Sequence, residues 1–179
     1  MSAPDAALHA NAVAFRGRGL LITGRAGSGK TSLSVEMMAL GADLIADDRV
    51  VLRCAGGLVL LSPPDTLAGL VELRGIGIIR RDFQADVPAA LVLNLNSELS
   101  SDSRAEPATR EETDHDGARR LPDPVFEDLL GLKVRRISQL WRPGLAAAMI
   151  LALQSGELLP GDHLPGQQNG DAMDQMSRS

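Results

Sequence analysis

Short apolar runs, separated by glycine, proline and charged residues, follow one another along the first half of the chain. Runs of this length between turn residues are typical of strands, whereas longer apolar stretches without glycine or proline favour helices. Two adjacent runs predict a β-hairpin, and a second pair is expected to meet across a glycine turn. Strands are therefore expected at 10–15, 19–23, 43–46, 49–53, 58–61, 89–95 and 132–140.

Three further segments predict helices. Residues 30–40 are compatible with a helix, and 145–153 form an apolar run long enough for one. A short helix is expected to begin at Asp65 or Thr66, either of which could cap it, and to continue to Leu70. The succession of hairpin, helix and strand predicts an α/β fold with a mixed sheet, in which antiparallel pairs lie beside parallel ones.

The pattern changes at 97–124, where large apolar residues almost disappear. A segment of this composition cannot bury enough apolar surface to fold alone, so we expect a polar, flexible insertion there. The chain is again rich in Gly, Pro, Gln, Asn and Ser near its end, and we expect a disordered tail at 160–179. The 179 residues therefore predict one domain, at 1–159.

Charge and composition exclude several classes of protein. The formal net charge of −5 argues against general nucleic-acid binding, which requires a basic face to neutralise phosphates. No apolar run approaches the ~20 residues of a membrane helix, and the N-terminal residues lack the pattern of a signal peptide. The single cysteine, Cys54, fits a reducing compartment. We therefore expect a cytoplasmic protein without nucleic-acid or membrane partners.

One segment matches the phosphate-binding loop motif G-x-x-x-x-G-K-[ST] at every fixed position. Its glycines allow backbone N–H groups to surround phosphate oxygens, Lys30 would neutralise their charge, and the Thr31 hydroxyl would bind Mg²⁺. An apolar strand precedes the motif and a helix follows it, as this chemistry requires. The motif predicts binding of a nucleoside triphosphate or another polyphosphate. Its residues are Gly24, Arg25, Ala26, Gly27, Ser28, Gly29, Lys30 and Thr31.

Two adjacent carboxylates, Asp47 and Asp48, interrupt the apolar run "LIADDRVVL" one helix after this motif. Either could be the acidic residue that holds Mg²⁺ in proteins with a phosphate-binding loop, or the base that accepts a proton from a hydroxyl substrate. Because neighbouring side chains of a strand point to opposite faces, we expect one to face the metal or γ-phosphate and the other to face elsewhere. Alternatively, both lie at a solvated strand end, with Asp48 paired to Arg49 or Arg53.

A second pattern, "GLVELRGIGIIR", occupies 69–80. It places an acid and a base, Glu72 and Arg74, before Gly75 and Gly77. Taken alone, the two glycines could be turn residues, and the acid and the base could pair in solvent.

Together, His9, "GRAGSGKTSL", "LIADDRV" and "LVELRGIGII" resemble the catalytic, C-terminal domain of HPr kinase/phosphorylase. The resemblance implies a Mg²⁺/ATP-dependent serine kinase acting on an HPr-like phosphocarrier of the phosphotransferase system, in the regulation of carbon and nitrogen metabolism. It also implies a fold similar to the nucleotide-binding domain of PEP carboxykinases, and a homo-oligomer, usually a hexamer in this family. Only eight residues precede His9, so the chain resembles the short forms without an N-terminal domain.

The resemblance implies a role for each matching residue. Lys30 matches the phosphate-binding lysine, Thr31 the hydroxyl ligand of Mg²⁺, and Glu72 its second ligand. Asp48 matches the carboxylate that accepts the serine proton and returns it in the reverse reaction, with Asp47 beside it. His9 matches an active-site histidine, and the stretch 71–80, which contains Arg74, matches the family signature that is important for catalysis. The catalytic candidates are thus Asp48, Asp47, His9, Lys30 and Arg74.

Two features depart from the family pattern. Near the C-terminus the family has an element tied to dephosphorylation, of which Arg142-Pro143-Gly144 is present but the following Arg-Asn is missing. The resemblance therefore supports kinase activity more than phosphorylase activity. The catalytic arginine expected in the middle of the domain falls in or near the polar stretch, where the candidates are Arg104, Arg119 and Arg120.

Two other functions compete with the protein kinase. The shortened C-terminal element and the long polar insertion are compatible with a non-catalytic regulator that binds a nucleotide and reports it to a partner. A small-molecule kinase with a phosphate-binding loop is the third hypothesis. It is weaker, because the chain shows no obvious lid segment with arginines unless 97–124 serves as one.

Overall fold

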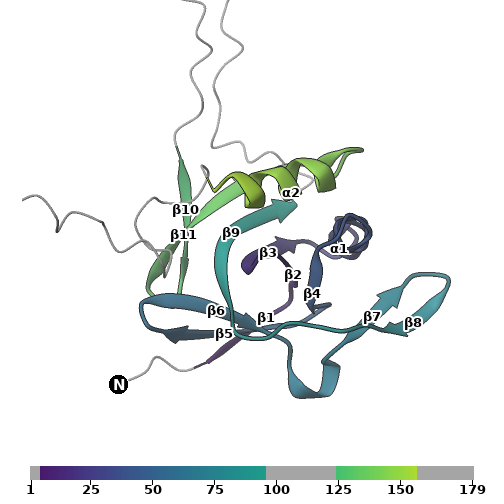
Figure 1. Ribbon diagram of the computed structural model, residues 1–179, viewed down its shortest axis with the longest axis horizontal. Helices are drawn as coiled ribbons and strands as arrows, with labels where there is room; N and C mark the ends of the chain where they lie inside the picture. The colour runs from purple at the N-terminus through teal and green to yellow at the C-terminus, as the bar shows by residue number, and fades with distance from the viewer. Residues whose placement is uncertain (1–4, 96–123, 157–179) are drawn as a thin grey trace, which may run out of the picture.

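The computed structural model of the chain describes residues 5–95 and 124–156 (Figure 1). Within these ranges the chain forms a nine-stranded sheet, a separate two-stranded sheet and two α-helices. The helices are α1 Lys30–Ala39 and α2 Leu145–Ser155, and a 3₁₀ turn, η1, spans Asp65–Leu67. The strands are β1 Ala6–Leu8, β2 Asn11–Phe15, β3 Arg18–Gly24, β4 Asp43–Ala46, β5 Val50–Ala55, β6 Leu58–Ser62, β7 Leu70–Leu73, β8 Gly77–Arg80, β9 Val87–Leu95, β10 Val125–Leu129 and β11 Leu132–Ser138.

Strands β4, β3, β9 and β11 of the large sheet run in the same direction. The strand order is β1-β5-β6-β9-β3-β2-β4, and β11, which pairs with β10, also joins β9. Strand β3 is parallel to β9, and β9 is parallel to β11. Strand β4 has the direction of β3 because both are antiparallel to β2. The carboxyl ends of β11, β9, β3 and β4 therefore meet at one edge of the sheet, which is where open α/β sheets bind ligands.

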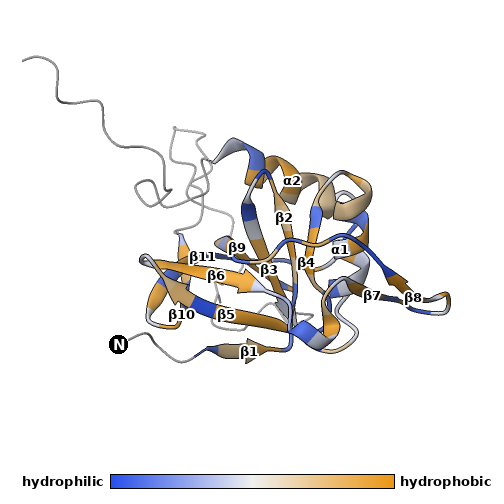
Figure 2. Ribbon diagram, turned by 60° about the horizontal axis from the view of Figure 1, so that its bottom comes forward, coloured by the Kyte–Doolittle hydropathy of each residue, from blue (hydrophilic) through white to orange (hydrophobic). Residues whose placement is uncertain are grey.

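The sheet buries apolar side chains on both faces. Along β3, Leu20 and Ile22 point toward a cluster that includes both helices, whereas Leu21 points to a second cluster on the opposite face. This is the alternation expected of a strand covered on both sides. Figure 2 shows that the central strands are largely hydrophobic, which fits their buried position. The helices thus cover one face of the sheet and leave its carboxyl edge accessible.

Strands β7 and β8 form a hairpin that extends away from the main sheet (Figure 1). They pair antiparallel, with Leu70 opposite Arg80 at one end and Leu73 opposite Gly77 at the other. Two large apolar side chains of this hairpin, Ile76 and Ile78, are 82% and 70% exposed. The hairpin therefore presents apolar surface to its surroundings.

Most elements expected from the sequence are confirmed, as is the mixed α/β fold. The expected helix from Asp65 or Thr66 to Leu70 is wrong: it is the single turn η1, no described side chain caps it, and Leu70 already belongs to β7. Strand 132–140 ends at Ser138. The sequence patterns did not predict β1 or β10, and they did not identify β7 and β8 as strands.

Parts of the expected organisation lie outside the described residues. These are the insertion at 97–124, apart from Pro124, and the tail at 160–179. Of the described helices, neither is long and apolar enough to cross a membrane.

Two leucines of α2 offer a matched test of this packing. Leu153 is 1% exposed and belongs to the helix-side core, whereas Leu151 is 64% exposed. We expect Leu153→Ala to lower the free energy of unfolding by about 2–5 kcal/mol, because it leaves a cavity. Leu151→Ala should change it by less than about 0.5 kcal/mol. Urea unfolding followed by circular dichroism measures both, and equal losses would contradict the packing of α2.

Candidate active site

The glycine-rich loop, residues 24–31, joins the carboxyl end of β3 to the start of α1. Gly29, at the N-cap of α1, has a φ of 97°, in the left-handed region that favours glycine. No side chain of the described residues caps this helix. The N–H groups of its first turn are therefore available to an anion, which the helix dipole also attracts.

The start of the loop is held closely against the neighbouring strand β9. A Cβ atom at Gly24 would lie 2.5 Å from the carbonyl oxygen of Leu95 and 2.7 Å from the hydroxyl oxygen of Ser28. Neither distance is possible for a real side chain, so this position requires glycine. The first glycine of the motif therefore sets the path of the loop by close packing.

Lys30 folds back over the loop that precedes it. Its Nζ donates to the carbonyl oxygens of Gly24 at 3.0 Å and Arg25 at 3.2 Å. Burial lowers the pKa of the Lys30 ammonium below its ordinary value; Asp48 and Asp47 act in the opposite direction, and Arg74 in the same direction. The ammonium is thus positioned at the loop, among charged groups from two other segments.

Asp47 is buried, with 7% of its surface exposed, and accepts hydrogen bonds from three elements. Its Oδ1 accepts from Nδ2 of Asn11, in β2, and from the Thr31 hydroxyl, in α1, at 3.1 Å. Its Oδ2 accepts from the backbone N–H of Glu72, in β7, at 3.0 Å. The amide of Asn11 also lies 3.2 Å from the Thr31 hydroxyl. One carboxylate therefore connects the sheet, the helix and the projecting hairpin.

Asp48 has a different environment from its neighbour. Its side chain is 64% exposed, and its Oδ1 lies 3.1 Å from Nδ1 of His9, which precedes β2. Its backbone adopts the left-handed conformation, with a φ of 70°. The pair of Asp48 and His9 is a carboxylate and an imidazole that solvent or a substrate can reach.

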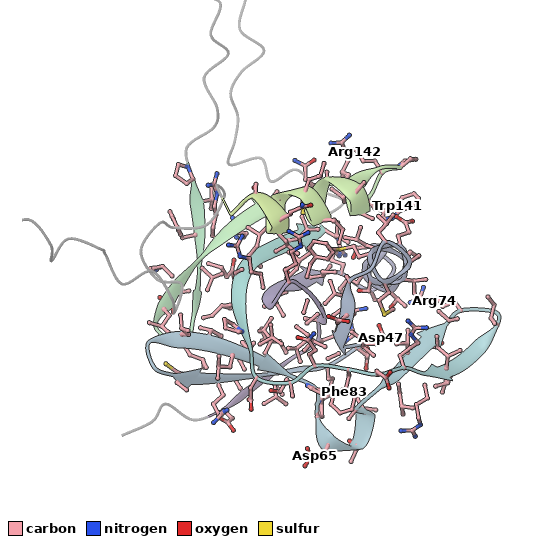
Figure 3. All side chains as sticks on the ribbon, in the orientation of Figure 1. Asp47, Asp65, Arg74, Phe83, Trp141 and Arg142 are labelled. Carbon is pink, nitrogen blue, oxygen red and sulfur yellow. The ribbon has the colours of Figure 1, made fainter. Side chains whose placement is uncertain are left out.

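One cavity of about 510 Å³ brings the predicted residues together. Figure 3 shows Asp47 and Arg74 between α1 and the β7–β8 hairpin. Of the loop, Ala26, Gly27 and Gly29 also line this cavity, whereas Gly24, Arg25 and Ser28 do not. The catalytic and metal-binding candidates that line it are His9, Lys30, Thr31, Asp47, Asp48, Glu72 and Arg74.

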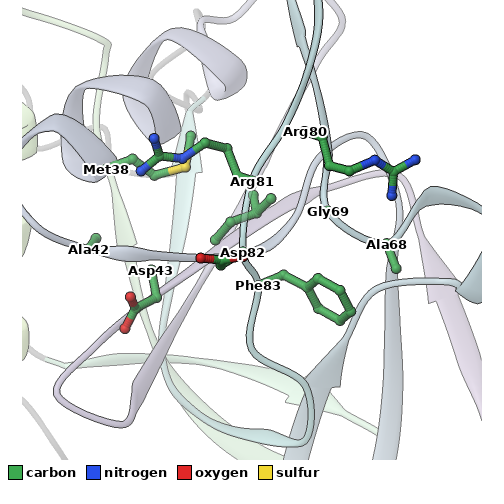
Figure 4. A pocket seen from close by; sticks show the side chains of 10 residues that line it. Met38, Ala42, Asp43, Ala68, Gly69, Arg80, Arg81, Asp82 and Phe83 are labelled. Carbon is green, nitrogen blue, oxygen red and sulfur yellow. The ribbon is translucent and has the colours of Figure 1, made fainter.

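A larger cavity, of about 630 Å³, lies near the opposite end of α1 (Figure 4). It is lined by Met38 from α1, Asp43 from β4 and the segment 80–83. None of the residues predicted to be catalytic or metal-binding lines it. Its volume is greater, but the glycine-rich loop and the residues predicted to be catalytic line the smaller cavity.

Two expectations about the aspartate pair are wrong. The residues do not alternate within a strand: they follow β4, and the left-handed backbone of Asp48 lets both side chains line the same cavity. The solvated alternative also fails, because Asp47 is buried and Arg53 pairs instead with Asp86 at 2.7 Å.

Two residues of this region were not found by sequence reasoning. Asn11 is 1% exposed inside the apolar strand β2, and a polar residue within such a run was an available signal. Trp141 packs on the glycine-rich loop, and it is the single tryptophan of the chain. The three arginines considered as catalytic, Arg104, Arg119 and Arg120, lie outside the described residues.

The donor set at the loop is compatible with Mg²⁺. Within the described ranges, no three His, Cys, Asp or Glu side chains cluster closely enough to hold a metal alone. The hydroxyl oxygen of Thr31 and the carboxylate of Asp47 are nevertheless adjacent, and Mg²⁺ prefers oxygen ligands. Because Mg²⁺ is usually bound by few protein groups together with phosphates and water, these residues could hold it alongside a polyphosphate.

Substitution of the two aspartates separates their structural contributions. Asp47→Asn replaces one acceptor oxygen with an N–H donor that faces other donors, so we expect the free energy of unfolding to fall by about 1–3 kcal/mol. Asp48→Asn, which alters an exposed side chain, should change it by less than about 0.5 kcal/mol. Chemical denaturation of both variants measures the difference. If Asp47→Asn were as stable as Asp48→Asn, the buried network would not support the site.

Known proteins resemble this chain over most of its length. The family model for the HPr serine kinase C-terminal domain matches residues 1–107. An HPr kinase/phosphorylase of Clostridium tetani (strain Massachusetts / E88) is 33% identical over 149 residues, which cover 83% of this chain and 47% of that protein. The corresponding protein of Clostridium botulinum (strain Eklund 17B / Type B) is 34% identical over 149 residues, with the same coverage. The chain thus spans about half the length of these relatives.

A solved structure shares the fold. It is described as the structure of the Hpr(Ser) kinase/phosphatase from Coxiella burnetii, with a TM-score of 0.65 and 22% sequence identity. The match covers 86% of this chain and 97% of that one. The fold resemblance and the family match confirm the resemblance that the sequence motifs had indicated.

Proposed function

The chain belongs to the family of HPr serine kinase C-terminal domains, and we propose that it is a Mg²⁺/ATP-dependent kinase that phosphorylates a serine of an HPr-like phosphocarrier. The observation that carries the proposal is one cavity that combines a glycine-rich loop, a buried carboxylate beside a threonine hydroxyl, and an exposed carboxylate–imidazole pair. Phosphoryl transfer needs these three parts for phosphate binding, Mg²⁺ binding and proton removal.

The loop and its lysine bind the phosphates in this proposal. The N–H groups at the start of α1 surround phosphate oxygens. The Lys30 ammonium leaves the carbonyl oxygens of Gly24 and Arg25 and pairs with a charged phosphate oxygen instead. The Thr31 hydroxyl, supported by Asp47, holds Mg²⁺, which supplies positive charge for the transferring group. Glu72, which lines the same cavity, is the second candidate ligand.

Asp48 accepts the proton of the substrate. The serine oxygen forms a bond to the γ-phosphorus while the bond from that phosphorus to the bridging oxygen of ADP breaks, and the serine proton passes to the Asp48 carboxylate. His9, at 3.1 Å, orients this carboxylate. Arg74 lies close enough to affect Lys30, and its guanidinium stabilises the negative charge of the transferred phosphoryl group. Asp48 is thus the catalytic base, and Asp47 organises the metal side.

A protein substrate fits the surface around the cavity. The exposed side chains of Ile76 and Ile78 lie on the hairpin that also contributes Arg74 to the site. Exposed apolar side chains next to a site are typical of a docking surface for another protein. This observation favours a protein hydroxyl over a small molecule as phosphoryl acceptor. Family membership further supports a homo-oligomer that works in the cytoplasm and regulates carbon or nitrogen metabolism.

Transfer to an HPr-like carrier tests the proposal directly. With Mg²⁺ and labelled ATP, the wild-type chain should place phosphate on a carrier serine. Asp48→Asn should reduce the rate by about 10²- to 10⁴-fold, the usual contribution of a general base, while ATP affinity changes less than about twofold. Asp65→Asn is a matched control, since Asp65 is exposed and distant from Asp47 (Figure 3).

The alternative functions give different results in this assay. ATP binding without transfer to any HPr-like carrier would contradict the kinase and favour a non-catalytic regulator. Transfer to a small-molecule hydroxyl, with the carrier left unmodified, would favour the small-molecule kinase.

The hairpin surface is tested by a steady-state experiment. Ile78→Ser should raise the KM for the carrier about tenfold, because burial of an isoleucine contributes roughly 1.5–3 kcal/mol, and should leave the KM for ATP unchanged, since Ile78 does not line the cavity. Leu151→Ser is the control, since this leucine is 64% exposed on α2. An unchanged KM for the carrier in Ile78→Ser would show that this face of the hairpin does not contact the substrate.

A further inference from the structure

Trp141 packs directly on the glycine-rich loop. A Cβ atom added at Gly29 would lie 3.2 Å from Cγ and 3.3 Å from Cδ1 of the indole, so the ring lies against the glycine backbone. The residue is nevertheless 43% exposed. A large aromatic side chain thus covers part of the loop with some of its surface and keeps the rest open.

The strand order places this indole on the far side of the loop from the aspartates. Strand β9 lies on one side of β3, and β2 and β4 lie on the other. Trp141 follows β11, which joins β9, and Gln139 continues this pairing by donating to the Asn94 carbonyl. Asp47 follows β4. Figure 3 shows Trp141 and Asp47 on opposite sides of α1, and Trp141 does not line the cavity that contains the aspartates.

The two sides of the loop therefore correspond to the two ends of a nucleotide. Transfer requires the γ-phosphate to lie near Asp48, on the β4 side. The α-phosphate, the ribose and the base must then extend away from this carboxylate, toward the β11 side. The exposed part of the indole on that side offers an apolar, polarisable surface to the base.

We propose that Trp141 is the residue on which the nucleotide base stacks, and so contributes to nucleotide affinity. This inference rests on the proposed function, since it assumes a nucleoside triphosphate with its γ-phosphate at Asp48. Stacking of a base on an aromatic side chain contributes about 1–3 kcal/mol and tolerates any base, because every base has a π-face. The site should accordingly discriminate weakly between ATP and GTP.

Comparison of ATP with inorganic tripolyphosphate separates the base from the phosphates. Isothermal titration of the full chain with each ligand, in the presence of Mg²⁺, gives both affinities. We expect Trp141→Ala to weaken ATP binding by about 5- to 150-fold and to change tripolyphosphate binding less than about twofold. Trp141→Phe keeps an aromatic face and should retain most of the ATP affinity. The fluorescence of the single tryptophan should change with ATP and not with tripolyphosphate.

The outcomes distinguish this inference from the proposed function. Equal weakening of both ligands by Trp141→Ala would overturn the inference, because the indole would then only support the loop. Unchanged ATP affinity in the same variant would overturn it as well. Binding of neither ligand to the wild-type chain would overturn the proposed function, on which the inference rests.

Discussion

The buried carboxylate of Asp47 is the interaction on which the candidate site depends. Its two oxygens accept from an asparagine of β2, a threonine of α1 and a backbone N–H of β7. Hydrogen bonds to a charged acceptor are stronger than neutral ones, and each of these donors would lose its partner if the carboxylate were removed. The hairpin forms a sheet of its own, so this contact with the main body helps to fix where Glu72 and Arg74 lie, together with the buried side chain of Val71. A single side chain thus positions groups from three elements.

A second constraint comes from the direction of the strands. Because β4, β3, β9 and β11 end at the same edge, the residues that directly follow these strands lie near one another. The aspartates follow β4, the glycine-rich loop follows β3 and Trp141 follows β11. The edge therefore carries the aspartates on one side, the glycine-rich loop in the centre and an indole on the other side, and the proposed function assigns proton transfer to the first and phosphate binding to the second.

The parts of this site that depend on local sequence could be predicted, and those that depend on long-range contacts could not. The spacing of glycines before Lys30 determines a loop conformation by itself, so the loop and α1 were found. The different environments of the two aspartates arise from the left-handed backbone of Asp48 and from Asn11, which is 36 positions from Asp47. No pattern within "LIADDRVVL" contains either fact. The position of Trp141 against Gly29 likewise follows from the pairing of β11 with β9.

The same argument explains the hairpin. Its apolar residues do not produce one buried face, because Ile76 and Ile78 are both exposed, so the pattern did not indicate strands. It could be recognised as important only through its resemblance to a family signature. Local rules therefore identified the glycine-rich loop, whereas the arrangement of the hairpin around Asp47 required the structure.

A crystal structure of the chain with Mg²⁺ and a non-hydrolysable ATP analogue tests the central claim most directly. The account predicts β- and γ-phosphates within the glycine-rich loop, Mg²⁺ bound to the Thr31 hydroxyl beside Asp47, and the γ-phosphate facing Asp48. Phosphates bound outside the loop, or a γ-phosphate on the Trp141 side with the base near the aspartates, would contradict it.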